Sequence, residues 1–424
     1  MATKWPFALA CLLATALAPL VHAQDTGTLR KGDPAQVGFD PGRLQRALSF
    51  VEESVASGRL TGAIVLVARR GVVVAERAYG VLDLESKRPC TTETIYPIAS
   101  ISKPMTATAV MILVDEGRLG LSDPVERYLP AFKEQKLKTP AGDLVHRPFT
   151  VRHLLTHTAG LPSNSPLRKL PVREWLKLPL SQTVDAAATV DLDNEPGTKL
   201  HYSAIGFATL GRIVEVISGR PFEQFMTERV FEPLGMRHTF YNVPRPLADG
   251  VARGMFFRMK DGRFDKFDPH EPDFKIVNTM PNAGVFTTAH DLAVFYQMFL
   301  NGGTYGGRRL LSPATVRMML ADQTANVMLA DQTAKLPDRW GLSWVLGSGR
   351  RDTGVAIHPE GIFSHIGSSG CYAWGDPVEG LIGSTHLIGD NGAGRMSGQE
   401  FRERFQHMVY AALQDTNETK YCRK

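Results

Sequence analysis

The stretch "YPIASISKPMTATAVMILVD", residues 96–115, places two serines and a lysine directly before a long apolar run. The apolar side chains of that run fill most of the circumference of a helix, which predicts a helix buried on nearly all sides. Ser100 and Lys103 are three residues apart, so both side chains project from one face at the start of this helix. A lysine in the first turn of a buried helix requires an explanation. The simplest explanation is that the lysine lies at the surface in a salt bridge.

The Ser-x-x-Lys pattern of Ser100 and Lys103 also suits nucleophilic catalysis. A helix N-terminus offers free backbone N–H groups and a positive potential, and both favour an oxyanion that develops there. Desolvation lowers the pKa of a lysine, so an amine beside a hydroxyl in a partly dry site can act as its base. The tetrapeptide occurs once in the chain, although composition would supply about one by chance.

The bulk properties describe a globular protein. The chain has 424 residues, of which 43% are apolar and 21% are charged, enough to bury a large core in one large domain or two closely packed domains. Its net charge of +5 is spread over the whole length, without a stripe of basic and aromatic residues. We therefore expect no nucleic-acid partner.

The periodicity predicts a mixed α/β (α+β) fold. Helices are expected after the N-caps Asp40 and Thr288, up to Gly219 in "IGFATLGRIVEVISG", and over "RPFEQFMTERVF". Two β-branched runs separated by Arg69-Arg70-Gly71 predict a hairpin. Four short strands, the first of them in "RWGLSWVLG", follow residue 338, while the loop-rich middle is helical. We expect an antiparallel sheet, built from about 36–95 and 338–415 and flanked by helices, plus a mainly helical insertion at about 125–260.

The N-terminus resembles a secretory signal peptide. Residues 1–23 contain Lys4, an apolar segment and a Val-His-Ala cleavage signal before Gln24. No later segment is apolar enough to span a bilayer, so we expect a periplasmic or secreted protein whose mature domain covers 24–424. The leader removes one of four cysteines, leaving Cys90, Cys371 and Cys422, which allow at most one intramolecular disulfide.

No metal or cofactor is expected. His153 and His157 have the spacing of a helical metal pair, but the residues between them include no glutamate, and packing or capping explains them better. A tandem duplication, "MLADQTANV" at 319–327 and "MLADQTAKL" at 328–336, is interpreted as a neutral loop extension.

Two later segments complete a candidate site. In "PGTKLHYSAIGFATLG", Tyr202 precedes a helix, and a phenol near a lysine could carry a proton between nucleophile and leaving group; a core tyrosine is the alternative. In "FSHIGSSGCYAWGDP", His365 and Gly367 lie in a Gly/Ser-rich strand edge, where backbone can approach a ligand closely. His365 and the N–H of Ser368 are candidates for the wall that faces the substrate.

In this order and spacing the three segments resemble the serine β-lactamase and penicillin-binding protein superfamily, most closely its class C-like branch and the family VIII carboxylesterases. Further segments strengthen the resemblance, which runs from about residue 36 to 410: "GRLGLSDPVERYLPAF", "TVRHLLTHTAGLP", "FEPLGMRHTFY" and "NAGVFTTAHDLAVF". The resemblance implies that Ser100 is the acylated nucleophile, with Lys103 and Tyr202 as its base pair. It further implies an oxyanion hole from the N–H groups of Ser100 and Ser368, in a cleft between a sheet domain and a helical domain.

Two departures concern the substrate. β-Lactamases of this branch carry Tyr-x-Asn and Lys-Thr-Gly, whereas this chain has Ala204 and His365-Ile366-Gly367. A neutral histidine attracts a carboxylate less than a lysine does, so anionic β-lactams and peptides should bind poorly. We expect an exported serine hydrolase that cleaves small-molecule esters through an acyl-enzyme on Ser100. The alternatives are a β-lactamase or D-amino-acid peptidase or transesterase, and a catalytically idle penicillin-sensor-like protein. The oligomeric state is left open.

Overall fold

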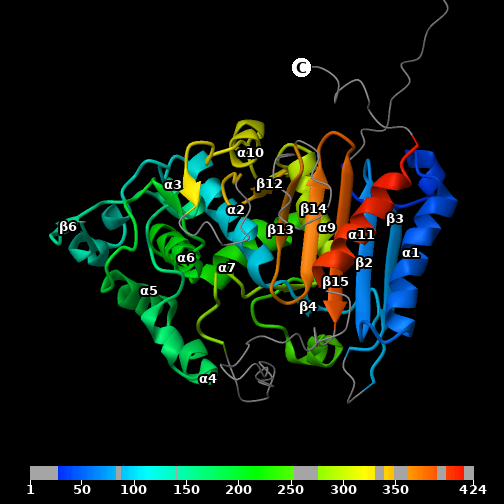
Figure 1. Ribbon diagram of the computed structural model, residues 1–424, viewed down its shortest axis with the longest axis horizontal. Helices are drawn as coiled ribbons and strands as arrows, with labels where there is room; N and C mark the ends of the chain where they lie inside the picture. Colours follow the sequence, from blue (N-terminus) through cyan, green and yellow to red (C-terminus); the bar gives the residue numbers. More distant parts are fainter. Residues whose placement is uncertain are drawn as a thin grey trace, which may run out of the picture.

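Strands from both ends of the chain form one seven-stranded sheet, in the order β1-β3-β2-β15-β14-β13-β12 (Figure 1). Only the short β1 runs parallel to its neighbour, β3, and every other adjacent pair is antiparallel. The predicted antiparallel sheet is therefore confirmed. The strands are β1 Arg30–Lys31, β2 Gly62–Arg69, β3 Val72–Gly80, β12 Val345–Leu346, β13 Phe363–Ile366, β14 Cys371–Asp376 and β15 Leu381–Ile388.

The computed structural model describes residues 27–82, 87–139, 141–252, 276–329, 339–347, 361–388 and 398–414. The predicted signal peptide at 1–23 and Cys422 lie outside these residues. Across the described ranges, every helix is too short or too polar to cross a bilayer.

The predicted hairpin is present, and its turn explains why it forms. Arg70 and Gly71 both have positive φ angles, 50° and 76°. This pair of left-handed residues matches the twist of two antiparallel strands, and a glycine adopts it without steric cost. All eight residues of β2 are buried, which places this strand inside the sheet with both faces covered.

Helices cover both faces of the sheet. On one face, α1 Pro41–Ala56 packs beside α11 Gly398–Ala411, the two terminal helices of the described chain (Figure 1). On the other face, α9 Ala289–Leu300 contacts β2, β14 and β15. The predicted N-caps are confirmed, since Asp40 accepts a hydrogen bond from Arg43 N at 2.9 Å and Thr288 accepts one from Asp291 N at 3.3 Å.

Most of the remaining helices form a second half of the molecule, called here the helical half, which lies beside the β12 edge of the sheet (Figure 1). Its α6 ends at Gly219, whose φ of 70° gives the left-handed cap expected there. A single helix was expected over "RPFEQFMTERVF", but the structure divides it with a π-helical turn at Thr227–Phe231. The helices of this half are α2 Ser102–Asp115, α3 Val151–Leu155, α4 Val172–Leu176, α5 Leu180–Ala188, α6 Ala204–Ser218, α7 Phe222–Met226, α8 Glu232–Leu234 and α10 Pro313–Met319.

Four two-stranded ladders connect the loops. One of them joins β4, just before Ser100, to β8, just before α9. Another joins β7, just before Tyr202, to β11, at the start of the second copy of the duplication. These ladders are β4 Tyr96–Pro97 with β8 Phe286–Thr287, β5 Lys136–Lys138 with β6 Leu144–His146, β7 Lys199–Leu200 with β11 Met328–Leu329, and β9 Thr304–Tyr305 with β10 Arg308–Arg309.

Helix α2, which follows Ser100, lies in the interior of the molecule. Every residue of α2 from Ser102 to Leu113 is buried, as its apolar circumference predicts. It belongs to the largest hydrophobic cluster, which extends from the sheet into the helical half. Its N-terminal end therefore meets both halves of the fold.

Candidate active site

Ser100 occupies a short 3-10 turn, Ala99–Ile101, between β4 and α2. The preceding Ala99 has a φ of 44°, a left-handed conformation that costs a non-glycine residue energy. Such strain persists where the surrounding structure fixes the backbone, and it is concentrated at functional sites. Here it turns the chain sharply from β4 into α2, directly before the candidate nucleophile.

Lys103 contacts this serine. Its Nζ lies 2.9 Å from Ser100 Oγ and donates a second hydrogen bond, of 3.1 Å, to the carbonyl of Asn282. The side chain is 1% exposed, and burial lowers the pKa of Lys103 from 10.5 to about 7. A large fraction of this amine is therefore neutral at pH 7, and its lone pair can take a proton across the 2.9 Å contact.

Tyr202 is the third residue of the group. Lys103 Nζ lies 4.6 Å from the centroid of its ring. Burial raises the pKa of Tyr202, and a hydrogen bond with Ser100 opposes that rise. The phenol thus stays protonated at ordinary pH, within reach of the serine. The structure brings Ser100, Lys103 and Tyr202 together as the sequence analysis expected.

His157 packs against the ring of Tyr202. Its imidazole stacks on the Tyr202 ring with centroids 4.4 Å apart, and its Nδ1 accepts the Ser203 N–H at 3.1 Å. Burial, and then the charge of Lys103, hold the pKa of His157 well below 6.5, so the ring is neutral. His153 instead completes the N-cap of α3 through the Thr150 N–H, at 3.3 Å. Packing and capping, the preferred interpretation of this pair, are confirmed.

A second polar group holds the turn that carries Tyr202. His201 Nε2 lies 3.0 Å from Ser163 Oγ, and His201 Nδ1 lies 3.5 Å from a carboxylate oxygen of Asp193. The backbone N–H of Ala204 donates to the Ser163 carbonyl at 2.8 Å. Both neighbours of the Tyr202–Ser203 pair are therefore tied to the loop after α3.

The loop between β13 and β14 closes the site from the sheet side. A Cβ at Gly367 would lie 2.3 Å from the Ile98 carbonyl oxygen, so only a glycine permits this approach. The hydroxyl of Ser369 donates to the Pro97 carbonyl at 2.7 Å, and the thiol of Cys371 contacts the same oxygen at 3.3 Å. These contacts fix the loop that carries Ser368 against the segment that leads into Ser100.

Cys371 is part of a buried cluster beneath this loop. Its Sγ lies 2.7 Å from His386 Nδ1, and the His386 ring stacks on Tyr96 with centroids 4.0 Å apart. Burial raises the pKa of the thiol to about 12 and lowers that of His386 to about 3, so both groups are neutral. Cys371 and Cys90 are both free thiols, so they do not form a disulfide.

His365 lies elsewhere than expected. It is 2% exposed, is absent from the lining of the cavity, and packs edge-on to Trp340 at 6.0 Å. Successive side chains of a strand point to opposite faces of the sheet, so the residues next to His365 face away from the side on which His365 is buried. Burial lowers the pKa of His365 to about 3, with the charge of Lys103 adding to the effect. This histidine is therefore neutral and does not line the cavity.

A cavity of about 380 Å³ lies beside the candidate nucleophile. Ser100, Lys103 and Tyr202 line it together with Ser368 and Ser369 from the sheet edge. Its other wall includes side chains that the sequence analysis did not identify, because no local pattern marks them: Asn164, Trp175, Thr183, Met280 and Asn282. Within the described part of the chain, the lining contains one cationic side chain, Lys103, and no carboxylate.

The two residues expected to form the oxyanion hole face the same cavity. Ser100 and Ser368 both line the cavity, from the 3-10 turn and from the sheet edge. Gly367 supports their approach through its contact with Ile98. The described residues hold no group of three or more side chains suited to binding a metal ion.

Comparisons with known proteins agree with this arrangement. A family model described as Beta-lactamase matches residues 48–398. A Mycobacterium tuberculosis protein, Rv1367c, is 34% identical over 282 residues, which cover 63% of this chain and 69% of the relative. A Salmonella schwarzengrund protein named "Putative D-alanyl-D-alanine carboxypeptidase" is 27% identical over 382 residues, covering 82% of this chain and 83% of the relative.

Solved structures share the fold. EstCE1, described as a hydrolase with promiscuous acyltransferase activity, superposes with a TM-score of 0.70 at 25% identity, covering 87% of this chain and 99% of its own. A penicillin-binding protein homologue from Caulobacter crescentus gives 0.67 at 23% identity, covering 89% and 99% respectively. Since the family model covers most of the chain and the neighbours share its architecture, the chain belongs to the beta-lactamase family of serine hydrolases.

Proposed function

We propose that this protein is an exported esterase that hydrolyses small neutral esters through an acyl-enzyme on Ser100. The observation that carries the proposal is the 2.9 Å contact between Ser100 Oγ and Lys103 Nζ, an amine whose pKa burial lowers to about 7. A neutral amine at this distance can accept the proton that the serine must lose before it attacks.

The proposed reaction has two halves. Ser100 Oγ attacks the ester carbonyl while its proton moves to Lys103, and the N–H groups of Ser100 and Ser368 hold the resulting oxyanion. The intermediate collapses to a Ser100 ester, and the departing alcohol takes the proton through the Tyr202 hydroxyl. Water then attacks the Ser100 ester and gives a proton to Lys103 and Tyr202, which pass it to Ser100 Oγ as the bond to the acyl group breaks and the acid is released.

The character of the cavity favours neutral substrates. A β-lactam or a D-alanyl peptide presents a carboxylate, yet Lys103 is the one cation among the described lining residues and it is partly neutral. Ala204 also lines the cavity and lacks the amide that would bind an acylamino group. Each missing charge-assisted hydrogen bond should cost on the order of 1.5 to 3 kcal/mol in transition-state binding.

Peptidase activity is the second candidate, because one relative is named as a D-alanyl-D-alanine carboxypeptidase. An idle sensor is disfavoured, since such a protein has no need to bury a lysine against a serine. A peptidase and an esterase would both use Ser100 as the nucleophile, so the two functions are distinguished by comparing activity toward peptide and ester substrates.

The test is a panel of p-nitrophenyl butyrate, nitrocefin and a D-alanyl-D-alanine peptide, with Ser100→Ala as the background. We expect kcat/KM for the butyrate to exceed that for the anionic substrates by about tenfold to a hundredfold. Comparable values for nitrocefin or the peptide would refute the ester assignment while leaving a serine hydrolase.

A further inference from the structure

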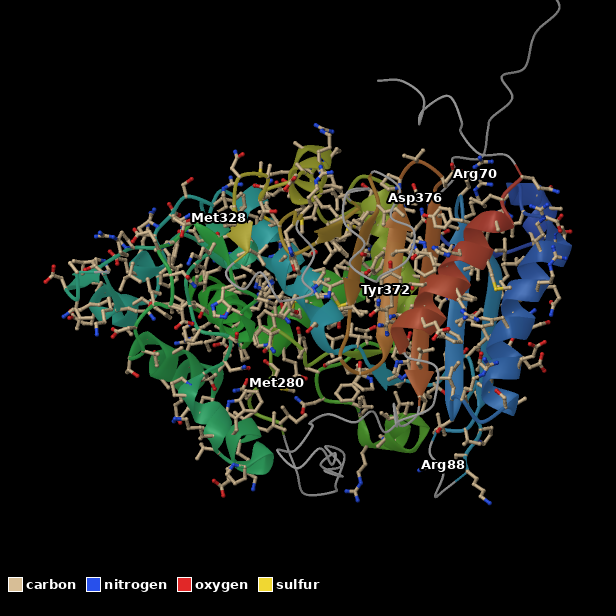
Figure 2. All side chains as sticks on the ribbon, viewed as in Figure 1. Arg70, Arg88, Met280, Met328, Tyr372 and Asp376 are labelled. Atoms are coloured by element: carbon tan, nitrogen blue, oxygen red, sulfur yellow. The ribbon has the colours of Figure 1, made fainter. Side chains whose placement is uncertain are left out.

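Two large apolar side chains of one hydrophobic cluster line the cavity. Trp175, on α4, and Met280, in the loop before β8, both line it and are only 6% and 4% exposed. With Leu176 and Ile276 they form a hydrophobic cluster that is separate from the main cores. Figure 2 labels Met280 between the helical half and the sheet. This part of the cavity is thus an apolar surface with its own packing.

The backbone holds Met280 in a strained conformation. Its φ of 46° is left-handed, which a methionine rarely adopts. The Met280 carbonyl accepts the N–H groups of Ala283 and Gly284, each at 2.8 Å, and its own N–H donates to Asn278 Oδ1 at 3.2 Å. A residue kept in such a conformation by several hydrogen bonds commonly has a functional role.

The same loop also holds the catalytic base. The carbonyl of Asn282 accepts from Lys103 Nζ at 3.1 Å, and the carbonyl of Pro281 accepts from Thr106 Oγ1 at 2.6 Å. One short segment therefore fixes the amine and, two residues earlier, presents the Met280 side chain to the cavity. The distance from the reacting serine to the apolar wall is set by a single rigid element.

The apolar part of the cavity suits the group that stays bound. During the reaction the alcohol must leave, whereas the acyl group remains covalently attached to Ser100 until water releases it. Ser368, in the loop between β13 and β14, lines the cavity and is exposed, which marks an open side next to the sheet through which an alcohol can depart. The buried surface of Trp175 and Met280 is left for the acyl chain.

On this basis we infer that Trp175 and Met280 form an acyl-chain subsite, selecting esters of apolar acids and limiting their length. This inference rests on the proposed esterase function. Each methylene that enters an apolar pocket should raise kcat/KM by about fourfold, until the chain reaches these two side chains. Ile205 and Ala208, which line the adjoining wall, keep the subsite uncharged.

The test measures kcat/KM for p-nitrophenyl acetate, butyrate, hexanoate and octanoate with the wild type, Met280→Ala, Met280→Phe and Trp175→Ala. We expect Met280→Ala and Trp175→Ala to move the optimum toward longer chains by about two carbons, and Met280→Phe to move it toward shorter ones. Met318→Ala is the matched control, because Met318 is 38% exposed on α10. Its profile should equal that of the wild type.

A second series varies the alcohol of a butyrate ester and leaves the acyl group fixed. The same variants should change kcat/KM by one common factor across this series. Titration of Ser100 with a phosphonate counts the competent sites in each preparation. Because kcat/KM is then calculated per competent site, a smaller folded fraction in one variant does not affect the comparison.

Unchanged acyl profiles in titratable Met280 and Trp175 variants would overturn the inference while leaving the esterase in place. Changes confined to the alcohol series would overturn it as well. A wild type that neither turns over esters nor reacts with the phosphonate would instead refute the proposed function itself.

Discussion

At the scale of single residues, burial is the property that suits Lys103 to its proposed role as a base. An exposed lysine would keep its proton at pH 7, whereas burial brings the pKa of Lys103 down to about 7. Burial moves the pKa of Tyr202 upward and that of His157 downward, so both neighbours keep their neutral forms. Lys103 is thus the group of this cluster that titrates near neutral pH.

We therefore predict a single acidic limb in the pH profile of kcat/KM. Lys103 acts as a base only when deprotonated, so activity should fall about tenfold per pH unit below its pKa of about 7 and level off above it. The measurement is kcat/KM for p-nitrophenyl butyrate from pH 5 to 9. Lys103→Arg, which remains protonated throughout, should be inactive at every pH. A flat wild-type profile across this range would contradict the assignment of Lys103 as base.

The sequence could identify some residues of the site and not others. Ser100 and Lys103 are three residues apart on one turn, so local spacing is enough to pair them. Trp175 and Met280 meet only through tertiary packing, and nothing in their own neighbourhoods points to a cavity. The position of His365 depends on the face that its strand presents, which a short Gly-rich segment leaves ambiguous.

At the scale of elements, the site lies where a loop of the sheet contacts the segment that leads into Ser100. The β13–β14 loop comes from the C-terminal part of the sheet, and β4 leads into the helical half. Ser369 joins them through its 2.7 Å hydrogen bond to the Pro97 carbonyl. We interpret this bond as a positioning contact that keeps the N–H of Ser368 close to Ser100.

We predict that Ser369→Ala lowers kcat about tenfold and changes KM little, because a displaced oxyanion donor weakens only the transition state. Affinity for a boronic acid transition-state analogue should fall by a similar factor. Ser384→Ala is the control: it also removes a buried hydroxyl from the sheet, and no hydrogen-bond partner of that hydroxyl is seen in the described structure. An effect on KM alone, or equal losses in both variants, would refute the positioning role.

Elements with strong local signals were predicted well. Asp40 and Gly219 mark helix ends through their capping chemistry, and the left-handed pair at Arg70 and Gly71 defines the hairpin. The π-helical turn at Thr227–Phe231 has no comparable marker. The segment "RWGLSWVLG" was expected to be a strand, yet only Val345–Leu346 pairs with the sheet, because the chain turns at Ser343, whose φ is 76°.

At the scale of the whole molecule, the site reduces stability. Moving the pKa of a lysine from 10.5 to about 7 destabilises the folded state by on the order of 5 kcal/mol below pH 7. The unfolded chain binds more protons than the folded one between these two pKa values, so this cost shrinks as the pH rises through that window. The rest of the fold must supply the difference, and its large buried cores do so.

We accordingly predict that Lys103→Met stabilises the protein at pH 6 by about 2 kcal/mol, after allowance for the two lost hydrogen bonds. The gain should shrink between pH 7 and 10, since the wild type regains stability there. Urea unfolding of both proteins at several pH values measures it. A variant less stable than the wild type at pH 6, or a gap independent of pH, would contradict the burial argument.

The central claim is that the reaction passes through a covalent ester on Ser100, and one measurement tests it directly. The wild type, Ser100→Ala and Ser102→Ala are treated with a phosphonate inhibitor, and peptide mass mapping locates the adduct. The Ser102 hydroxyl is buried and accepts the Val285 N–H at 3.1 Å, so it faces away from the substrate. We predict one stoichiometric adduct on Ser100 in the wild type and in Ser102→Ala, and none in Ser100→Ala, which should also lack esterase turnover. An adduct on Ser102, Ser203 or Ser368, or an active Ser100→Ala enzyme, would contradict the account.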